Sequence, residues 1–227
     1  MHSMTYGIGV RFSHKESFTV SHRRIYAVLP AAGRSRRMGR PKLLLPLGGS
    51  TVIARLVGAL RAGGVDDVIV VVRPDDTTLQ EAAEAAGAQV VCPENDPADM
   101  RQSVQYALDY LATERHPNAD DGWMLIPADH PLVDAKIVES LLASWRAGAA
   151  PILIPTHEGR RGHPTLFRWE LSDEVPRIPP HQGLNRLVHD HESHVQEFPV
   201  PSDHILLDLD TLEDYERLQV EWRRENE

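Results

Sequence analysis

Short apolar runs with the character of buried strands alternate along this chain with segments that have the periodicity of amphipathic helices. Residues 67–72 are a nearly continuous β-branched run, which is typical of a strand covered on both faces. Residues 51–62 place their apolar side chains on one helical face and end at Gly63-Gly64. Strands and helices that alternate in this way predict an α/β fold with a doubly wound, mostly parallel sheet.

The other predicted elements follow the same alternation. Strands are expected over 25–29, 67–72, 89–91, 123–126 and 152–154, and helices over 51–62, 77–86, 99–112 and 134–147. Thr211 and Asp214 have the spacing of a capping box, so the last helix is expected to begin there. A single domain is expected over residues 25–227. The polar residues 1–24 lack the apolar segment of a signal peptide and are predicted to be a disordered extension.

The composition narrows the class of protein. The formal net charge of −9 argues against DNA or RNA as a main partner. No apolar run approaches the roughly 20 residues of a membrane span, and the single cysteine, Cys92, excludes an internal disulfide framework. These features predict a cytoplasmic protein without a membrane or nucleic-acid partner, acting as a monomer or weak homo-oligomer.

A compact cluster of positive charge follows the first predicted strand. Five cationic side chains lie within nine positions of this acidic chain: Arg34, Arg36, Arg37, Arg40 and Lys42. The small residues just before them, Ala31, Ala32 and Gly33, let backbone N–H groups approach an anion. The stretch has neither the spacing of a P-loop nor the G-x-G-x-x-G fingerprint of dinucleotide sites. It predicts a specific polyphosphate site rather than a surface for polyanions.

Residues 31–39, which read AAGRSRRMG and are followed by Lys42, resemble the signature loop of the MobA-like nucleotidyltransferases. The resemblance implies a Rossmann-like nucleotidyltransferase fold and an enzyme that transfers a nucleoside monophosphate from a nucleoside triphosphate to a phosphorylated acceptor. It implies that the nucleotide is bound by Ala31, Ala32, Gly33, Arg34, Ser35, Arg37 and Lys42. Arg37 and Lys42 are then the catalytic cations that neutralise the phosphates.

A carboxylate, Asp129, follows the predicted strand 123–126 and lies between Pro127 and Pro131, which stiffen the turn. Nucleotidyl transfer uses a divalent cation, and Mg²⁺ typically takes one or two protein carboxylates. Residues 126–132 also resemble the family's L-[GA]-D-x-P-[LW] motif, which implies that Asp129 is catalytic and a ligand of Mg²⁺.

A second metal ligand is expected from residues 205–215, which resemble the family's D-[IV]-D-T-P-E-D segment. Asp208 and Asp210 alternate at strand period, so they are expected to share a face. Asp208 is favoured for the metal, because Asp210 precedes a predicted helix and would also suit its N-cap.

On the acceptor side, residues 159–167 resemble a segment of the molybdopterin cytidylyltransferase branch of the family. Two arginines between glycines predict a mobile cationic loop, and the resemblance implies that Arg160, Arg161 and His163 bind the acceptor's phosphate. The alternative is a hairpin turn with a structural histidine. The three histidines nearby, His189, His191 and His194, have no spacing suited to zinc and are expected to be a surface cluster.

Three stretches depart from that branch and leave the acceptor open: 99–104, His130 and 180–186, all expected to face the acceptor. The acceptor is therefore molybdopterin, a sugar 1-phosphate or a methylerythritol phosphate. The Ala-Ala-Gly sequence at 31–33 is that of the cytidylyl branch and favours CTP over GTP. A nucleotide-binding regulator without catalytic activity is the alternative from a different class, and the presence of Lys42 and Asp129 argues against it.

Overall fold

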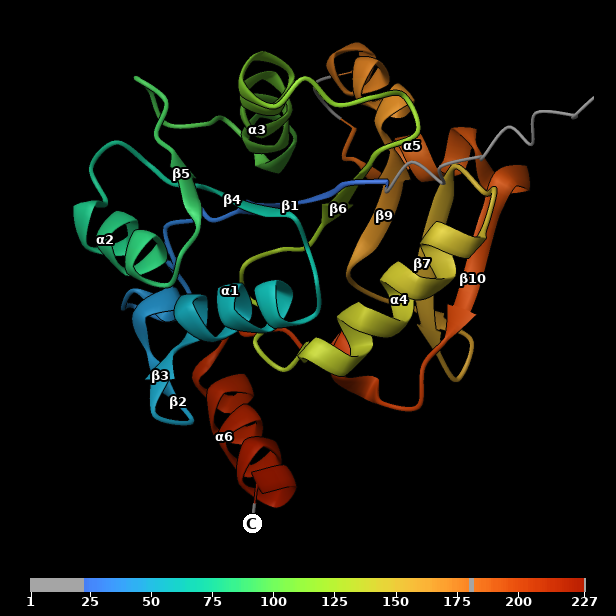
Figure 1. Ribbon diagram of the computed structural model, residues 1–227. Coiled ribbons are helices and arrows are strands. Elements are labelled where there is room, and N and C mark those ends of the chain that lie inside the picture. Colours follow the sequence, from blue (N-terminus) through green and yellow to red (C-terminus); the bar gives the residue numbers. More distant parts are fainter. Residues whose placement is uncertain (1–22, 180–181, 227) are drawn as a thin grey trace, which may run out of the picture.

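The computed structural model describes residues 23–179 and 182–226 (Figure 1). Most of the predicted disordered extension, residues 1–22, and Pro180 and His181 of the divergent stretch lie outside the described residues. The last two residues of that extension belong to the folded domain. The guanidinium of Arg23 donates to the carbonyl of Gly148 at 2.8 Å, and the backbone N–H of Arg24 donates to Asp121 at 2.9 Å.

The fold is built on one large sheet with the strand order β10-β7-β9-β6-β1-β4-β5. These strands are β1 (Ile25–Pro30), β4 (Asp67–Val71), β5 (Gln89–Val91), β6 (Gly122–Leu125), β7 (Ile152–His157), β9 (Thr165–Arg168) and β10 (Val195–Pro199). The short β8 (Arg160–Arg161) pairs with β7, and β2 (Pro46–Leu47) with β3 (Ser50–Thr51) forms a separate hairpin. All pairs among β6, β1, β4 and β5 are parallel, whereas β9 is antiparallel to both of its neighbours.

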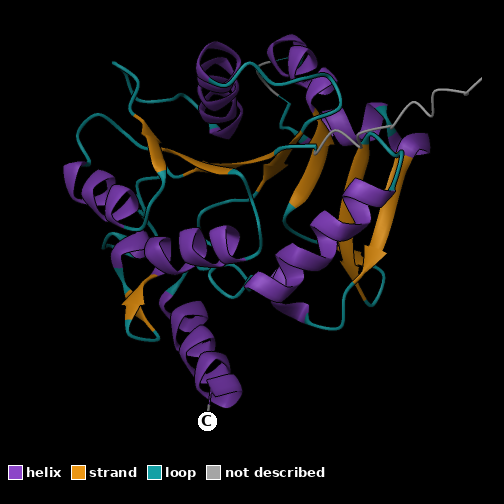
Figure 2. Cartoon of the chain, viewed as in Figure 1, coloured by secondary structure: helices purple, strands orange, loops and turns teal. Residues whose placement is uncertain are grey.

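Helices cover both faces of this sheet (Figures 1 and 2). The α-helices are α1 (Val52–Ala62), α2 (Thr77–Ala85), α3 (Met100–Glu114), α4 (Ala135–Ala147), α5 (Asn185–Asp190) and α6 (Leu212–Asn226). The 3₁₀ segments are η1 (Lys42–Leu44), η2 (Trp169–Arg177), η3 (Glu192–His194) and η4 (Asp203–Leu206). One hydrophobic core packs α1, α2, α4 and α6 against the sheet, and a second packs α3, α5 and η2 against the opposite face. The doubly wound α/β prediction is therefore confirmed.

Four helices begin where the sequence predicts, because each has a side-chain N-cap. Thr51, Asp76, Asp99 and Asp134 accept hydrogen bonds from the N–H groups three residues later in α1, α2, α3 and α4. The strands β9 and β10 were not predicted. Four and five residues of mixed pattern do not identify a strand by themselves, and their pairing partners decide the conformation.

The sheet places the candidate site at one edge. The parallel strands β1, β4 and β6 end side by side, and the chain leaves β1 into the basic loop and leaves β6 toward Asp129. Ligand crevices in open α/β sheets lie outside the carboxyl ends of such strands. Among the helices of residues 23–179 and 182–226, none is both long and apolar enough to cross a bilayer.

Candidate active site

The basic loop after β1 is tied to the sheet at its start and closed on itself at Ser35. The N–H of Ala31 donates to the carbonyl of Val71 at 2.9 Å, so this amide pairs with β4, while Ala31 still lines the cleft. Ser35 has a positive φ of 47°, and its carbonyl accepts the N–H groups of Met38 and Gly39. Its hydroxyl accepts the N–H of Lys42 at 3.3 Å. Ser35 therefore fixes the turn that delivers Lys42 to the site.

A cleft of about 270 Å³ opens between this loop and two other segments. Its first wall is formed by residues 30–33 with Lys42 and Leu43, its second by residues 97–100 with Ser103, and its floor by residues 127–129. A smaller hollow beside it is lined by Gly33, Ser35, Arg36, Arg37, Lys42 and Asp210. Lys42 and Gly33 border both spaces, so the two adjoin at the loop and are together called the binding region.

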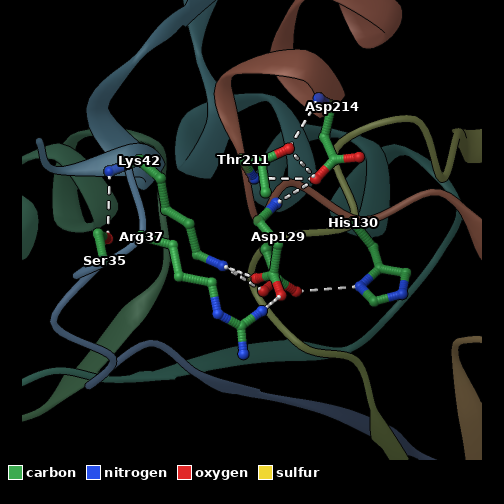
Figure 3. Close-up of polar contacts among 8 residues, drawn as sticks. Ser35, Arg37, Lys42, Asp129, His130, Thr211 and Asp214 are labelled. Carbon is green, nitrogen blue, oxygen red and sulfur yellow. Dashed lines mark hydrogen bonds and ion pairs between the residues drawn. The ribbon is translucent and has the colours of Figure 1, made fainter. Parts of the chain in front are cut away.

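Lys42 lies between two carboxylates that come from distant parts of the chain (Figure 3). Its ammonium group is 2.6 Å from Asp129 and 2.9 Å from Asp210. The Lys42 side chain is 14% exposed, and Asp129 is 21% exposed. Arg37 contacts the other oxygen of Asp210 and is itself largely exposed. The predicted catalytic residues Arg37, Lys42 and Asp129 are thus brought together at the end of β6.

Two hydrogen-bonded contacts bring Asp210 into this cluster. The N–H of Leu209 donates to the carbonyl of Asp129 at 2.9 Å, which holds the two segments side by side. Thr211 caps α6 and exchanges hydrogen bonds with Asp214, whose carboxylate also accepts the N–H of Asp210 at 3.2 Å. The capping box at Thr211 and Asp214 is confirmed.

Of the two candidate aspartates, Asp210 is the one that reaches the cluster. The N-cap of α6 is Thr211, so the expectation that Asp210 serves as the cap is wrong. Asp208 and Asp210 do alternate with the buried Leu207 and Leu209, but they do so in an extended segment rather than in a strand. The ion pairs to Lys42 and Arg37 belong to Asp210 and not to Asp208.

The local charges keep this cluster ionised. Burial favours the neutral form of Lys42, but the charges and hydrogen bonds of Asp129 and Asp210 outweigh it and raise the pKa of Lys42. Burial likewise disfavours the charged Asp129, yet the hydrogen bond from His130 and the nearby Lys42 lower the pKa of Asp129 to about 2. Near neutral pH the site therefore holds a cation between two carboxylates.

Two histidines lie behind Asp129. A ring nitrogen of His130, Nδ1, is 3.1 Å from Asp129, and the His130 ring stands edge-on to the ring of His163 at 4.9 Å between centroids. The Nδ1 of His163 is buried, and within the described part of the chain it has no hydrogen-bond partner. Burial, with a smaller contribution from His130, lowers the pKa of His163 to about 4. His163 is therefore neutral in the folded protein at physiological pH.

This buried neutral histidine makes stability depend on pH. The pKa of His163 in the folded protein is below the ordinary 6.5, so between these two values the unfolded chain binds a proton and the folded chain does not. The free energy of unfolding therefore decreases as pH falls from about 6.5 to about 4. We expect this loss to be smaller in His163→Gln by up to about 3 kcal/mol. Urea unfolding of both proteins at pH 7, 5.5 and 4.5 measures it. An equal loss of stability with falling pH in the wild type and in His163→Gln would contradict the low pKa assigned to His163.

The segment predicted to bind the acceptor forms a paired hairpin rather than an irregular loop. Arg160 and Arg161 form β8, paired with β7 around a turn at Glu158 and Gly159. Arg161 is held by Glu192 at 2.6 Å and by Glu197 at 2.8 Å, and these carboxylates raise its pKa. Gly162 is needed because a Cβ there would lie 2.4 Å from the carbonyl oxygen of Ile205. The hairpin alternative describes this backbone correctly.

Next to this hairpin lies a second hollow of about 490 Å³. Its lining is Ile154, Arg161, Gly162, His163, Thr165, Asn185, Val188, His189 and Glu192. His163 connects this hollow to Asp129 through its contact with His130. Arg160 is exposed but is not part of the lining. In the histidine cluster, His189 and His194 are exposed, and His191 pairs with Glu174 at 2.9 Å.

Several contacts around the cleft were not foreseen. Of the stretch 99–104, expected to face the acceptor, Asp99, Met100 and Ser103 line the same cleft as Ala31 and Ala32. Arg34, expected to bind nucleotide, is paired with Asp75 at 3.5 Å and with Asp96. Arg73, which follows β4, donates to the carbonyls of Ala32 and Gly33. A single arginine after a strand carries no motif, so only its contacts reveal this role.

Comparison with known proteins agrees with this geometry. The family model of the MobA-like NTP transferase domain matches residues 27–195. The chain therefore belongs to the MobA-like NTP transferase family, whose members carry a nucleotidyltransferase domain of this fold.

Among curated relatives, the chain is 34% identical over 131 residues to the bifunctional protein GlmU of Leifsonia xyli, covering 56% of this chain and 26% of the relative. It is 32% identical over 141 residues to a 2-C-methyl-D-erythritol 4-phosphate cytidylyltransferase of Streptomyces avermitilis, covering 58% of this chain and 53% of the relative. The chain thus spans about a quarter and about half of the lengths of these relatives.

Among solved structures, Rv0371c of Mycobacterium tuberculosis H37Rv is similar, with a TM-score of 0.72 and 29% identity over 88% of this chain and 100% of that one. A complex of Rv0371c with manganese superposes with a TM-score of 0.67 at 28% identity, over 87% of this chain and 98% of that one.

Proposed function

We propose that this protein transfers CMP from CTP to a small phosphorylated acceptor such as molybdopterin and releases pyrophosphate. The observation that carries the proposal is the placement of Lys42 between Asp129 and Asp210, directly beside the small-residue loop at the carboxyl ends of the strands. Such chemistry depends mostly on positioning and on electrostatic stabilisation of phosphate charge. The oxygen of the acceptor's phosphate attacks the α-phosphorus of CTP, and the bond to the β-phosphate oxygen breaks.

The two carboxylates fit a hard divalent cation. Asp129 and Asp210 converge on one positive charge, the Lys42 ammonium, and both present oxygen ligands. Within the described residues no cluster of three or more protein ligands is present, and a Mg²⁺ site completed by substrate phosphates needs only one or two. When bound, Mg²⁺ or Mn²⁺ would neutralise phosphate charge. The complex of Rv0371c with manganese supports this choice of ions.

The nucleotide fits the first cleft. Residues 97–100 and Ser103 line the cleft together with Ala31 and Ala32, whose small side chains leave room for a base. The triphosphate would then extend over Gly33 toward the hollow lined by Arg37 and Lys42. Arg37 and Lys42 would attract the phosphates electrostatically, and the backbone N–H groups of the loop would orient them. The Ala-Ala-Gly sequence and the likeness to a cytidylyltransferase support CTP, with GTP as the competitor.

The acceptor fits the second hollow, beside His163. Arg161 lines it as the partner of Glu192 and Glu197, and the contacts from His163 through His130 lead from the hollow to Asp129. Asn185 and His189 add polar groups to the lining. A phosphorylated acceptor placed here would approach the nucleotide from the side of Asp129.

The hollow gives a testable prediction. Arg161→Ala removes the positive charge and also leaves Glu192 and Glu197 without their partner, so we expect the KM for the acceptor to rise about tenfold while the KM for CTP changes little. Arg160→Ala is the matched control, because Arg160 is the neighbour that does not line the hollow. Steady-state kinetics with each substrate varied measure the effect. A selective rise in the KM for CTP would place the acceptor elsewhere.

The proposed reaction is tested by pyrophosphate release. The protein is incubated with Mg²⁺ or Mn²⁺, with CTP or GTP, and with molybdopterin, methylerythritol 4-phosphate or a sugar 1-phosphate as acceptor. Release with CTP and one acceptor, absent without metal, is expected. The similarity to a 2-C-methyl-D-erythritol 4-phosphate cytidylyltransferase favours methylerythritol 4-phosphate as the alternative acceptor. Tight nucleotide binding without turnover with any acceptor would instead support a regulator.

A further inference from the structure

Arg73 lies directly behind the small-residue loop and contacts its backbone. The side chain is 12% exposed, and one guanidinium nitrogen, Nη1, donates to the carbonyl of Gly33 at 2.9 Å and to that of Ala32 at 3.4 Å. Arg73 lines neither the cleft nor the smaller hollow, so the two loop carbonyls are held by a side chain that lies outside the binding region.

The guanidinium is fixed on its other edge. Its Nε pairs with Asp75 at 2.9 Å, and its Nη2 pairs with Asp76 at 2.9 Å. Asp76 is itself anchored, because it caps α2 by accepting the N–H of Leu79. Five donors in a rigid plane let one arginine hold two aspartates and two carbonyls at once.

Because the peptide bond is planar, these contacts also determine the direction in which the N–H groups of the loop point. In a trans peptide the C=O and the next N–H point in opposite directions. Because the carbonyls of Ala32 and Gly33 face Arg73, the N–H groups of Gly33 and Arg34 face away from it. In the described part of the chain neither N–H donates to a protein acceptor, and Gly33 lines both spaces of the binding region. Two successive free N–H groups form a concave site for an anion.

We propose that Arg73 is a positioning residue that presents the amides of Gly33 and Arg34 to the phosphates of the bound nucleotide. This inference rests on the proposed function, since it takes the anion to be a nucleoside triphosphate. Arg73 acts through the loop backbone and does not itself touch the nucleotide, because its guanidinium is occupied by Asp75, Asp76 and the two carbonyls.

The experiment separates this orientation from a simple loss of positive charge. Binding of CTP, of CMP and of GTP is measured by calorimetry for the wild type, Arg73→Ala and Arg73→Lys, at about 50 mM and about 500 mM KCl. We expect Arg73→Ala to lose about tenfold or more in triphosphate affinity at both salt concentrations, and much less for CMP. Arg73→Lys keeps the charge but not the planar fork, so we expect it to recover only part of the loss.

Arg115→Ala is the matched control. Arg115 pairs with Asp67 at 2.6 Å at the opposite end of β4 and is 29% exposed, so its removal costs a comparable ion pair without touching the loop. We expect its nucleotide affinity to equal that of the wild type. The amide ¹⁵N–¹H signals of Gly33 and Arg34 provide a second readout: they shift on addition of CTP in the wild type and shift less in Arg73→Lys.

The outcomes are distinguishable. A wild type that binds neither CTP nor GTP overturns the proposed function and this inference with it. A wild type that binds, together with Arg73 variants of equal affinity or with a loss that disappears at about 500 mM KCl, overturns the inference alone. If Arg73→Ala does not fold, the calorimetry and amide shifts of Arg73→Lys decide the question.

Discussion

Replacing Lys42 with alanine is expected to lower kcat by about 10²–10³ while weakening nucleotide binding far less. Lys42 is the partly buried cation at the point where the loop meets Asp129, so its charge stabilises the phosphates most when charge develops in the transition state. Single-turnover rates and calorimetric affinities for CTP measure the two effects separately.

Lys136→Ala is the control for Lys42→Ala, because Lys136 is exposed on α4 and does not line the cleft. Unchanged kcat in Lys42→Ala would show that the lysine is only a structural partner of the two aspartates. A loss confined to KM would place it in ground-state binding instead.

Replacing Asp129 with asparagine is expected to abolish metal-dependent turnover without unfolding the protein. The amide keeps the size of the carboxylate but loses the charge that binds a divalent ion. Asp129 is partly exposed at a strand end rather than packed in the core, so the melting temperature is expected to change by only a few degrees. Activity as a function of Mg²⁺ and Mn²⁺, with thermal melts, measures both effects.

Variants of Asp210 and Asp208 test which of them is the second carboxylate that binds the metal. Asp210→Asn is expected to behave like Asp129→Asn, because Asp210 shares Lys42 with it, and Asp208→Asn is expected to retain most of the activity. The reverse order would restore Asp208 as the metal ligand. Full activity of Asp129→Asn at low metal concentration would show that Asp129 is only a turn residue.

The sequence was sufficient for the elements that local chemistry determines. The β-branched run at 67–72 and the capped helices have residue patterns that determine their secondary structure locally. The loop at 31–39 is a motif of neighbouring residues, and Asp129 follows a predicted strand. The alternation of strands and helices then places both at the same edge of the sheet.

Contacts between distant segments could not be predicted in this way. The sequence gives no sign that Arg161 is paired, because its partners Glu192 and Glu197 are 31 and 36 residues away. The pairing of β8 and β10 with β7 brings these carboxylates close to Arg161. Which of Asp208 and Asp210 lies beside Lys42 depends on the hydrogen bond from Leu209 to Asp129, which joins two distant segments. Arg73 belongs to no recognisable motif, so its contact with the carbonyl of Gly33 could not be predicted. The contribution of residues 97–100 to the cleft depends on how α3 packs on the sheet.

The C-terminal helix has a consequence for how long the site stays complete. Asp210 is joined to the first turn of α6 by Asp214, and the match to the family model ends at residue 195, well before it. Along α6, Leu218 is fully buried and Trp222 stacks on Arg55 at 3.3 Å, while many of its residues are exposed. Exposed helices of this kind open locally at a lower free energy than the whole domain unfolds. Opening of the first turn of α6 would remove the hydrogen bond by which Asp214 holds the backbone of Asp210, so the lifetime of the complete cation site depends on the stability of that turn.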